Sequence, residues 1–506
     1  MTVNGRALLA AVLGGLVFAL CSPPFDLLPG IWLGLAVLHW VTVDAPRART
    51  AFFRGWVWAA SAALLGMRFI PGVVDRFTPL GVTGGVAALV LLALGQGVSW
   101  GLGALLARGL ARRVGLPEPV AFATAMTVAS TLTLVIAWSP GALLSPWLAA
   151  VQLAEFVGER GVTFLVALVA ALCAEPLRRL LGGARRPWQV PLAIAAGVGV
   201  LQFGSGALLL EREARAQRER PTLRVGVLQP AVEAKLRWEP AQRQEILRHL
   251  RTLTMESEAE DVDLTVWPEA AYPYPIAHGP HRTRRGREAI IGGGVRGPVL
   301  FGVLTQAPDG QGRHNSATIV DRDAHTQLAQ AKMELLWFGE TVPLSSVFPV
   351  LRRWFFRAGG LVPGDSVNLL TAGPARIGVL NCFEDTLPAV GRRLMAHEPN
   401  LLVNVTNDAW FPAPEPEFHL RLSVLRAVEL RRDLVRAVNL GAAGWIDSTG
   451  RVRARADETR ANVIVVTPAL NDGPRTLYAR FGDAPLLTVV LGWGFVALVR
   501  RRRRAQ

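Results

Sequence analysis

Three residues of different chemistry follow apolar, strand-like runs in this sequence. Cys382 ends the run 375–381 (ARIGVLN), and Glu269 comes shortly after the run 263–266. Lys332 lies in the segment that follows a third such run. Loop residues at the ends of buried strands are held on a rigid support and often carry the chemistry of a protein. A thiol, a carboxylate and an amine in such places predict one catalytic site.

A cysteine that attacks a carbonyl carbon needs a base for its proton and a cation or donor for the oxyanion that forms. Glu269 fits the base, because the neighbouring Trp267 and the turn at Pro268 favour a raised carboxylate pKa. Lys332 fits the stabilising cation, and Cys382 fits the nucleophile. On spacing alone, a buried structural cysteine remains the alternative for Cys382.

The two lysines stand out because this chain otherwise uses arginine for positive charge. Of 54 basic residues, only Lys235 and Lys332 are lysine. A lysine kept in such a chain suggests a need for its compact, titratable amine, although chance survival explains either one equally well. Neither lies in a GxxxxGK[ST] setting, which excludes a P-loop.

The cysteines predict neither a disulfide framework nor a metal centre. Cys21, Cys173 and Cys382 lie far apart and lack CxxC or metal-ligand spacing. The glycines at 292–294 lack the rest of a dinucleotide-binding fingerprint and fit a turn. We therefore expect no metal and no cofactor.

The composition predicts a membrane protein. The chain has 506 residues, of which 51% are hydrophobic, and a net charge of +15. The arginines gather in short loops between apolar stretches, a pattern typical of membrane orientation, so nucleic acid is not an expected partner. Eight stretches are candidate spans: 7–21, 28–43, 55–71, 81–107, 119–138, 162–174, 188–210 and 485–499.

The charges of the loops predict the orientation of these spans in the membrane. If all eight cross the membrane, arginine-rich loops such as 178–186 and the tail 500–506 share one side. By the positive-inside rule that side is the cytoplasm, which places both termini inside. The segment 222–470 is then extracytoplasmic. Arginines near 212–220 disagree, but they alternate with glutamates and precede a long domain, where the rule is weak.

The hydrophobicity pattern of the segment 222–470 is typical of an α/β domain. Seven strand-like runs alternate with helical patterns around Ile246–Leu253 and Phe418–Leu434, which favours a largely buried sheet. The predicted runs are 222–229, 263–267, 298–305, 316–321, 376–381, 400–406 and 462–467. The predicted organisation is therefore a membrane domain at 1–210 with about seven transmembrane helices, a catalytic domain at 222–470, a transmembrane helix at 485–499 and a basic tail at 500–506.

Several motifs give this chain a family resemblance. They occur in the order and roughly the spacing of the nitrilase superfamily: WPEAAYP around Glu269, KMELLWFGETVP from Lys332, PGDSVNLL at 363–370, NCFED around Cys382 and NDAWF at 407–411. Together with the apolar spans, they resemble the bacterial apolipoprotein N-acyltransferases. SPPF at 22–25, LQPAVEAKLRWEP at 228–240 and RAVELRRDLVRAVNLG at 426–441 extend the resemblance over nearly the whole chain.

The resemblance implies a multi-span α-helical membrane domain joined to an α-β-β-α sandwich, with a Glu269, Lys332, Cys382 triad. It further implies supporting roles for Glu340 and Glu384, and for Trp238 on a mobile loop. The implied reaction moves an acyl chain from a phospholipid to Cys382 and then to the amine of a diacylglyceryl-cysteine lipoprotein. The implied location is the bacterial inner membrane, with the catalytic domain on the periplasmic side. We expect a monomer whose partners are the phospholipid donor, the diacylated apolipoprotein acceptor and membrane lipid.

Three departures from the family pattern bear on the pocket more than on the triad. Leu335-Leu336-Trp337 precedes FGE where a His-Leu-Val-Pro type of run is usual. Pro412 follows Trp410-Phe411 where a glycine is usual, and Val438-Asn439 replaces Thr-Asn. His419 fits a packing or capping role.

Three other functions are alternatives to this reaction. A membrane-anchored amidase, or an acyltransferase that acts on another amine, would use the same triad. A catalytically lapsed homologue that binds lipid is an alternative from a different class, although the intact Glu269, Lys332 and Cys382 argue against it. Transport is disfavoured, because the spans carry few ionisable residues.

Overall fold

The computed structural model describes residues 3–132, 138–181, 189–233, 235–307, 310, 312–355 and 360–505. The chain divides into two compact units. The helical unit comprises Met1–Val74, Gly81–Glu211 and Phe481–Gln506, and the sheet unit comprises Asp75–Leu80 and Arg212–Arg480.

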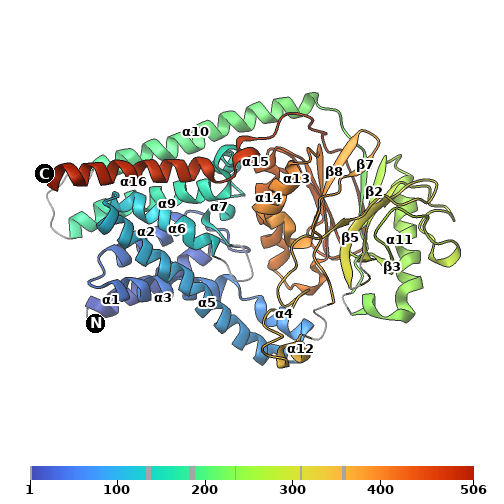
Figure 1. The fold of residues 1–506 in the computed structure, drawn as a ribbon, viewed down its shortest axis with the longest axis horizontal. Helices are drawn as coiled ribbons and strands as arrows, with labels where there is room; N and C mark the ends of the chain where they lie inside the picture. Colours follow the sequence, from blue (N-terminus) through green and yellow to red (C-terminus); the bar gives the residue numbers. More distant parts are fainter. Residues whose placement is uncertain are drawn as a thin grey trace. The chain divides into compact units, whose positions relative to one another are not determined.

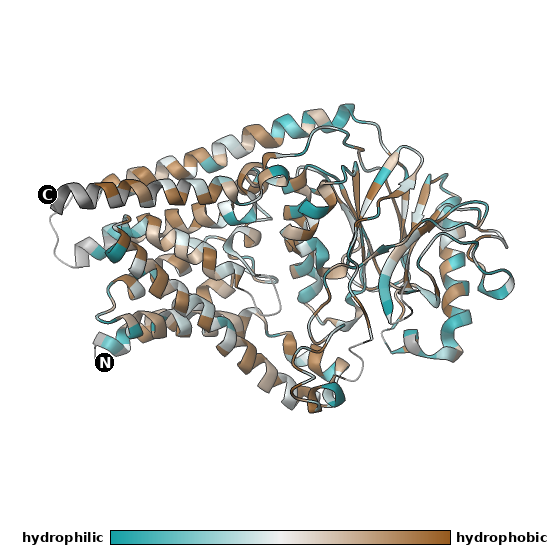
Figure 2. Ribbon diagram, in the orientation of Figure 1, coloured by the Kyte–Doolittle hydropathy of each residue, from teal (hydrophilic) through white to brown (hydrophobic). Residues whose placement is uncertain are grey.

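The helical unit consists of apolar helices, most of which Figure 2 colours brown. These helices are α1 (Val3–Ala19), α2 (Gly30–Val43), α3 (Ala48–Gly66), α5 (Gly81–Gly109), α6 (Glu118–Thr131), α7 (Pro140–Leu143), α8 (Leu148–Val151), α9 (Ala154–Leu181), α10 (Gln189–Glu219) and α16 (Ala484–Ala505). A π-helical turn, Leu110–Val114, continues α5, and α4 (Ile70–Phe77) leads from this unit into the sheet unit.

Small residues allow the helices of this unit to approach closely. Helix α3 packs against both α1 and α5, and α9 packs against α2 and α6. Where α1 meets α3, a Cβ atom on Gly15 would lie 2.1 Å from the carbonyl oxygen of Trp58. That crossing therefore requires glycine, as is common where apolar helices pack in a membrane.

Among the described residues, three helices are long and apolar enough to cross a membrane: Gly81–Val114, Ala154–Pro176 and Gln189–Glu219. A fourth candidate is the pair Ala48–Gly66 and Ile70–Phe77, which is bent by 61° and can count as one broken span. Asn4–Ala19, Gly30–Val43 and Ala484–Val496 are shorter apolar helices. These long apolar helices indicate that the chain is a membrane protein.

Helices occupy each of the eight predicted spans, but residues 133–137 of the span 119–138 and residue 188 of the span 188–210 lie outside the described residues. So do Arg185 and Arg186 of one predicted cytoplasmic loop. The number of spans that cross the membrane, the domain limits and the orientation of the loops remain predictions.

The strands of the sheet unit form two sheets. Among the described residues, one has seven strands in the order β13-β1-β2-β4-β5-β6, with β3 also paired to β4, and the other has six in the order β12-β11-β10-β9-β8-β7. The strands are β1 (Val225–Gln229), β2 (Leu264–Val266), β3 (Tyr272–Ala277), β4 (Val299–Gln306), β5 (Arg313–Val320), β6 (Gln330–Ala331), β7 (Leu370–Ala372), β8 (Ala375–Asn381), β9 (Leu401–Thr406), β10 (Leu434–Val438), β11 (Gly444–Ile446), β12 (Val452–Arg455) and β13 (Asn462–Val466).

Helices cover the outer faces of both sheets. In Figure 1, α13 (Pro388–Met395) and α14 (Glu415–Leu430) lie on one side of the two sheets, and α11 (Arg243–Glu258) lies on the other. The remaining helices of this unit, α12 (Val350–Trp354) and α15 (Leu477–Phe481), are short. The order of layers is thus helix, sheet, sheet, helix, which confirms the predicted α-β-β-α sandwich.

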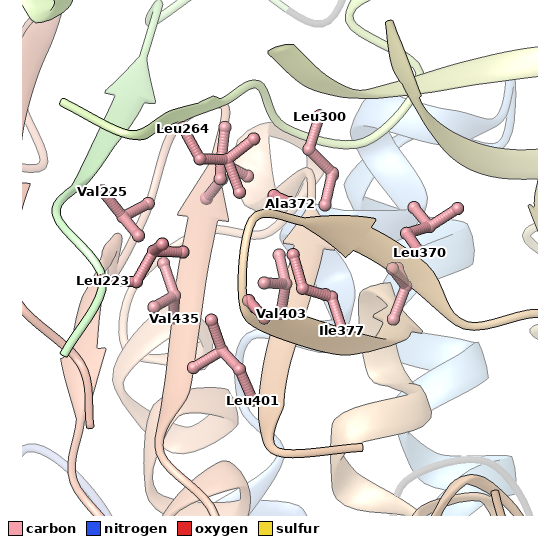
Figure 3. Close-up of a cluster of buried hydrophobic side chains, with 14 of the residues drawn as sticks. Leu223, Val225, Leu264, Leu300, Leu370, Ala372, Ile377, Leu401, Val403 and Val435 are labelled. Atoms are coloured by element: carbon pink, nitrogen blue, oxygen red, sulfur yellow. The ribbon is translucent and has the colours of Figure 1, made fainter. Parts of the chain in front are cut away.

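The main core lies between the two sheets, where side chains from both interdigitate (Figure 3). Val225 and Leu264 come from the seven-stranded sheet, and Ile377 and Val403 from the six-stranded sheet. Each is fully buried and contributes roughly 1.5–3 kcal/mol of transfer free energy. Phe301 alternates to the opposite face, where it packs with the α11 layer.

All seven strand-like runs predicted from the sequence contain strands, but six strands of the described residues were missed. The clearest error is β10. The sequence predicts a helix within 418–434, which α14 confirms, but it predicts no strand after it, whereas Leu434 starts a central strand. A hydrophobicity pattern does not detect this strand, because the strand contains Arg436. The charge of Arg436 is fully buried against Asp385. A buried charge is acceptable only with such a partner, and the partner belongs to another element.

Candidate active site

A cavity of about 790 Å³ in the sheet unit is lined by Glu269, Lys332 and Cys382. The structure therefore brings together the three residues that the sequence analysis selected. Apolar side chains form another part of its wall: Phe77, Leu304, Leu336, Leu361, Trp410 and Phe411. A chemically reactive, charged region thus adjoins surface that can accommodate hydrocarbon.

Sheet topology explains why these residues meet. Strands β1, β2 and β4 are parallel, as are β8, β9 and β10. Glu269 follows β2 and Cys382 follows β8, so both lie at carboxyl ends of parallel strands. Strand β5 is antiparallel to β4, so the start of β5, which carries Asn315, lies at the carboxyl end of β4. Strand β6 is antiparallel to β5, so the end of β6, just before Lys332, lies at that same end.

Cys382 lies on a sharp turn between β8 and the 3-10 helix Cys382–Thr386. Its φ is +52°, a left-handed conformation that is uncommon for a residue with a side chain. The Asn404 side chain donates to the Cys382 carbonyl oxygen at 2.8 Å and so holds the turn. The turn leaves the Cys382 side chain 8% exposed, at the wall of the cavity.

Glu384 fastens this turn to the segment that carries Lys332. Its fully buried carboxylate accepts hydrogen bonds from the backbone of Asn381 at 2.9 Å, Met333 at 2.7 Å and Glu334 at 2.9 Å. Burial raises the pKa of Glu384 to about 7, although these donors oppose that shift. Glu384 therefore joins the turn that carries Cys382 to the Lys332 segment, and its supporting role in catalysis remains a prediction.

Lys332 lies between two carboxylates. Its amine is 2.7 Å from Glu340 Oε2 and 3.7 Å from Glu269 Oε1. Asn315 joins the same carboxylates, since its Nδ2 donates to Glu269 at 2.6 Å and to Glu340 at 2.9 Å. We call Glu269, Asn315, Lys332 and Glu340 the cavity cluster, and all four line the cavity. The predicted supporting residue Glu340 thus fixes the position of the Lys332 amine.

The pKa values in the site favour general base catalysis by Glu269. Burial raises the Glu269 pKa, Glu340 adds to the shift, and Lys332 opposes it. Burial and the Glu269 charge raise the pKa of the Cys382 thiol to about 12. The resting cysteine is therefore a neutral thiol at physiological pH, so attack requires a base that removes the proton as the new bond forms.

A second group of polar residues lies behind the turn that carries Cys382. His419 Nε2 is 2.8 Å from Asp385 Oδ1, and its Nδ1 is 3.2 Å from Asp408 Oδ1. Ser423 donates to Asp385 at 2.7 Å, and Arg436 pairs with the same carboxylate. We call Asp385, Asp408, His419, Ser423 and Arg436 the rear cluster. None of these five lines the cavity.

The rear cluster favours a charged imidazole. Burial opposes the charge on His419, but Asp408 and Glu415 outweigh burial and raise the His419 pKa to about 9. The sequence suggested a packing or capping role for His419, and the structure adds ion pairs with two aspartates. As an imidazolium it links Asp385, on the 3-10 helix that begins at Cys382, with Asp408, on the loop after β9.

Two domain models match the chain. The apolipoprotein N-acyltransferase N-terminal domain matches residues 14–172, and the carbon-nitrogen hydrolase domain matches residues 224–473. The apolipoprotein N-acyltransferase of Geobacter metallireducens is 29% identical over 99% of this chain and 96% of its own. That of Azotobacter vinelandii is 31% identical over 98% of this chain and 95% of its own. The chain belongs to the apolipoprotein N-acyltransferase family.

An amidase from Nesterenkonia sp. is a weaker structural relative of this family member. It shares 16% sequence identity over 53% of this chain and 95% of its own, with a TM-score of 0.37. The family assignment depends on the full-length relatives and the two domain models.

The departures from the apolipoprotein N-acyltransferase pattern lie at or near the cavity. Leu336 lines it, next to an exposed Trp337. Asn439 follows Val438 and donates to Asn407 Oδ1 at 2.9 Å and to the Val232 carbonyl at 2.7 Å. It therefore joins the loop after β9 to the loop after β1. Trp238 ends the 3-10 helix Leu236–Trp238, but its side chain lies outside the described residues, so its role remains a prediction.

Sequence reasoning missed two cavity residues, Asn315 and Arg237. Asn315 was detectable in principle, because it lies in the polar first half of β5, Arg313 to Ser316, ahead of the more apolar Ala317 to Val320. Arg237 gave no signal, since one arginine among many resembles a surface charge. Its guanidinium donates to the Glu269 backbone carbonyl, and this contact exists only in the folded chain.

Proposed function

We propose that this chain acylates lipoproteins: it takes an acyl chain from a phospholipid as a thioester on Cys382 and transfers that chain to the α-amine of a diacylglyceryl-cysteine. The observation that carries the proposal is the shared cavity of Glu269, Lys332 and Cys382, whose wall is partly apolar. Full-length similarity to proteins named apolipoprotein N-acyltransferase supports it.

In the first half-reaction, the Cys382 sulfur attacks the carbonyl carbon of the donor ester while Glu269 takes the thiol proton. Lys332 stabilises the oxyanion of the tetrahedral intermediate. The intermediate then collapses, the ester C–O bond breaks, and Glu269 returns the proton to the departing oxygen. The products are a thioester on Cys382 and a lysophospholipid.

In the second half-reaction, the uncharged lipoprotein amine attacks the thioester carbonyl carbon. Glu269 removes a proton from the nitrogen and gives it to the leaving sulfur, so that an amide forms and the Cys382 thiol is restored. The donor product leaves before the acceptor reacts, which makes the mechanism ping-pong. The apolar wall at Leu336, Trp410 and Phe411 favours the amine over water by limiting hydration of the thioester.

A membrane location suits two lipid-bound substrates. Moving an acyl chain into water costs about 0.8 kcal/mol per CH2 group, so substrates that arrive from the bilayer avoid a large penalty. We propose the bacterial inner membrane, with residues 222–470 periplasmic and both termini cytoplasmic. We further propose that the protein acts as a monomer with its phospholipid donor and lipoprotein acceptor. Cysteine labelling from each side of the membrane, at positions in 500–506 and in exposed loops of the sheet unit, tests the orientation.

The decisive experiment is mass spectrometry of the full chain after incubation with phospholipid vesicles. We expect a hydroxylamine-labile acyl mass on the peptide that contains Cys382, and no adduct in Cys382→Ala. Addition of a diacylated lipopeptide with a free amino terminus should discharge the adduct as an N-acyl product. Absence of an adduct in the folded protein would favour a lapsed lipid-binding homologue. Discharge by water at the same rate as by lipopeptide would favour a hydrolase.

A further inference from the structure

Asn407 lines the same cavity as Glu269, Lys332 and Cys382, but the proposed mechanism gives it no role. Strands β8 and β9 are parallel neighbours; Cys382 directly follows β8, and Asn407 directly follows β9. Neighbouring strands lie about 4.8 Å apart, so the two residues leave the sheet side by side. Asn407 is 6% exposed. A nearly buried amide thus borders the turn that carries Cys382.

Hydrogen bonds fix which end of the Asn407 amide faces the cavity. Asn439 pairs with Val232 in both directions: its Oδ1 accepts from the Val232 N–H at 3.0 Å, and its Nδ2 donates to the Val232 carbonyl at 2.7 Å. The same Nδ2 is 2.9 Å from the Asn407 amide, so the Asn407 atom at this contact must be the acceptor, Oδ1. The Ala409 N–H also donates to this oxygen, at 3.4 Å. The Asn407 Nδ2 is therefore the polar atom that faces the cavity.

This Nδ2 group is a donor without an acceptor. Among the described residues, nothing accepts a hydrogen bond from it. Asn315, the other asparagine of the cavity wall, differs, because its Nδ2 donates to both Glu269 and Glu340. A nearly buried donor of this kind lowers stability unless a ligand or water accepts from it. We therefore expect a substrate oxygen in front of Asn407.

The proposed mechanism has room for a second donor at the oxyanion. An ammonium group has three N–H donors. The Lys332 amine lies 2.7 Å from Glu340 and 3.7 Å from Glu269, so two of its donors are directed at carboxylates and one remains for the oxyanion. Sites that stabilise an oxyanion generally combine several donors that are oriented before the reaction. The Asn407 amide is oriented in this way, since Asn439 and Ala409 hold its oxygen.

We propose that Asn407 is a further catalytic residue: its Nδ2 donates a hydrogen bond to the acyl carbonyl oxygen that becomes the oxyanion. Asn439 is its positioning residue, because it turns the Nδ2 group toward the cavity. This inference rests on the proposed function. Since the ester and the thioester are attacked at the same carbonyl carbon, Asn407 serves both half-reactions.

Asn407→Asp tests the donor with little change of shape. The aspartate still offers an oxygen to Asn439 and Ala409, but it presents a second oxygen to the cavity in place of the N–H group. We expect thioester formation on Cys382, measured by mass spectrometry of the full chain with phospholipid vesicles, to slow roughly 10²–10³-fold, as for loss of one oxyanion donor. Asn462→Asp makes the same change at a half-buried position of β13 outside the cavity wall and should react normally.

Infrared spectroscopy of the acyl-enzyme measures the contact itself. The thioester band is isolated by comparing acyl chains with isotope-labelled and unlabelled carbonyl carbons. A hydrogen bond to the carbonyl oxygen weakens the C=O bond and lowers its stretching frequency. Asn407→Leu, which has neither a donor nor a charge, should therefore raise the frequency, whereas Asn462→Leu should leave it unchanged. A purely structural role of Asn407 would not produce this shift.

Asn439→Asp tests the orientation without changing Asn407. An aspartate at this position accepts hydrogen bonds only, so the Asn407 amide should turn its Nδ2 toward it and leave Oδ1 facing the cavity. We expect a rate loss similar to that of Asn407→Asp and the same rise in the carbonyl frequency.

The outcomes separate this inference from the proposed function. A normal rate of thioester formation in Asn407→Asp would overturn the role of Asn407, while the acyl-enzyme mechanism would stand. A slow rate with an unchanged carbonyl frequency in Asn407→Leu would also overturn it, because the residue would then act only on the fold. Absence of a thioester in the unmodified chain would overturn the proposed function, and this inference with it.

Discussion

The cavity cluster and the rear cluster share one arrangement and differ in access. In each, a buried cation lies between two carboxylates: Lys332 between Glu269 and Glu340, and His419 between Asp385 and Asp408. All members of the cavity cluster line the cavity, whereas no member of the rear cluster does. Ion pairing alone therefore does not mark a catalytic group. The comparison teaches that access to the cavity, and not ion pairing, distinguishes the groups proposed to react from the groups that pack behind them.

The largest effect should follow removal of the base. Glu269→Gln keeps the size of the side chain but cannot accept the thiol proton. We expect thioester formation to slow by roughly 10²–10⁴-fold, as measured by time-resolved mass spectrometry of the Cys382 peptide. Glu245→Gln, on the exposed face of α11, makes the same chemical change outside the cavity and should react normally. Rapid acylation of Glu269→Gln would show that Glu269 is not the base.

A somewhat smaller loss of rate is expected when the Lys332 amine is removed. Lys332→Gln removes the cation that faces the oxyanion and leaves Glu269 and Glu340 to repel each other. The rate of thioester formation should fall by roughly 10²–10³-fold. Lys332→Arg keeps the charge but forces a larger group into a fully buried position, so it should rescue little activity. Full rescue by arginine would show that charge alone is required there.

Disruption of the rear cluster should lower the stability of the fold more than the rate of thioester formation. His419→Ala leaves Asp385 and Asp408 without the cation between them, and breaking a buried pair costs about 3–5 kcal/mol. We expect a large fall in thermal stability and, below the new unfolding temperature, a loss of no more than about tenfold in thioester formation. His419→Gln should recover part of the stability, because its amide still donates. A rate loss as large as that of Lys332→Gln, without loss of stability, would erase the distinction between the clusters.

The stability of the rear cluster should also depend on pH in one direction. The folded His419 pKa of about 9 lies above its ordinary value of about 6.5. Its contribution is therefore complete below pH 6.5 and disappears as the pH rises through 9, with a magnitude on the order of 3 kcal/mol. Urea unfolding at pH 6, 8 and 10 should show a smaller decline in His419→Gln than in the unmodified chain. Parallel declines would assign the pH dependence to other groups.

The smallest effect should be a shift in the acid limb of the pH–rate profile. The Glu340 charge raises the Glu269 pKa, so Glu340→Gln lowers that pKa and moves the acid limb of thioester formation to lower pH. The rate at the optimum should fall less than tenfold, because Lys332 keeps Glu269 as a partner. An acid limb that stays in place, or moves to higher pH, would show that Glu269 is not the titrating base.

Apolar strands were the most predictable part of the fold. Runs such as 376–381 and 400–406 are buried on both faces, and their continuous hydrophobicity is visible in the sequence. Strand β10 was not predictable by this signal, because Arg436 occupies a buried position inside it. Short strands such as β6 (Gln330–Ala331) have no pattern of their own and exist because β5 lies beside them.

The sequence by itself determined several of the buried strands, the apolar helices and the choice of Glu269, Lys332 and Cys382 as candidate site residues, which the structure brings to one cavity. These features are local, since they depend on residue type and on the period of hydrophobicity along the chain. Only the tertiary structure decided that Glu340 and Asn315 hold Lys332 beside Glu269, and that His419 lies behind the cysteine rather than in the cavity. The physical reason is that the free energy of a buried charge depends on partners from other elements, and the chain order does not encode their distance.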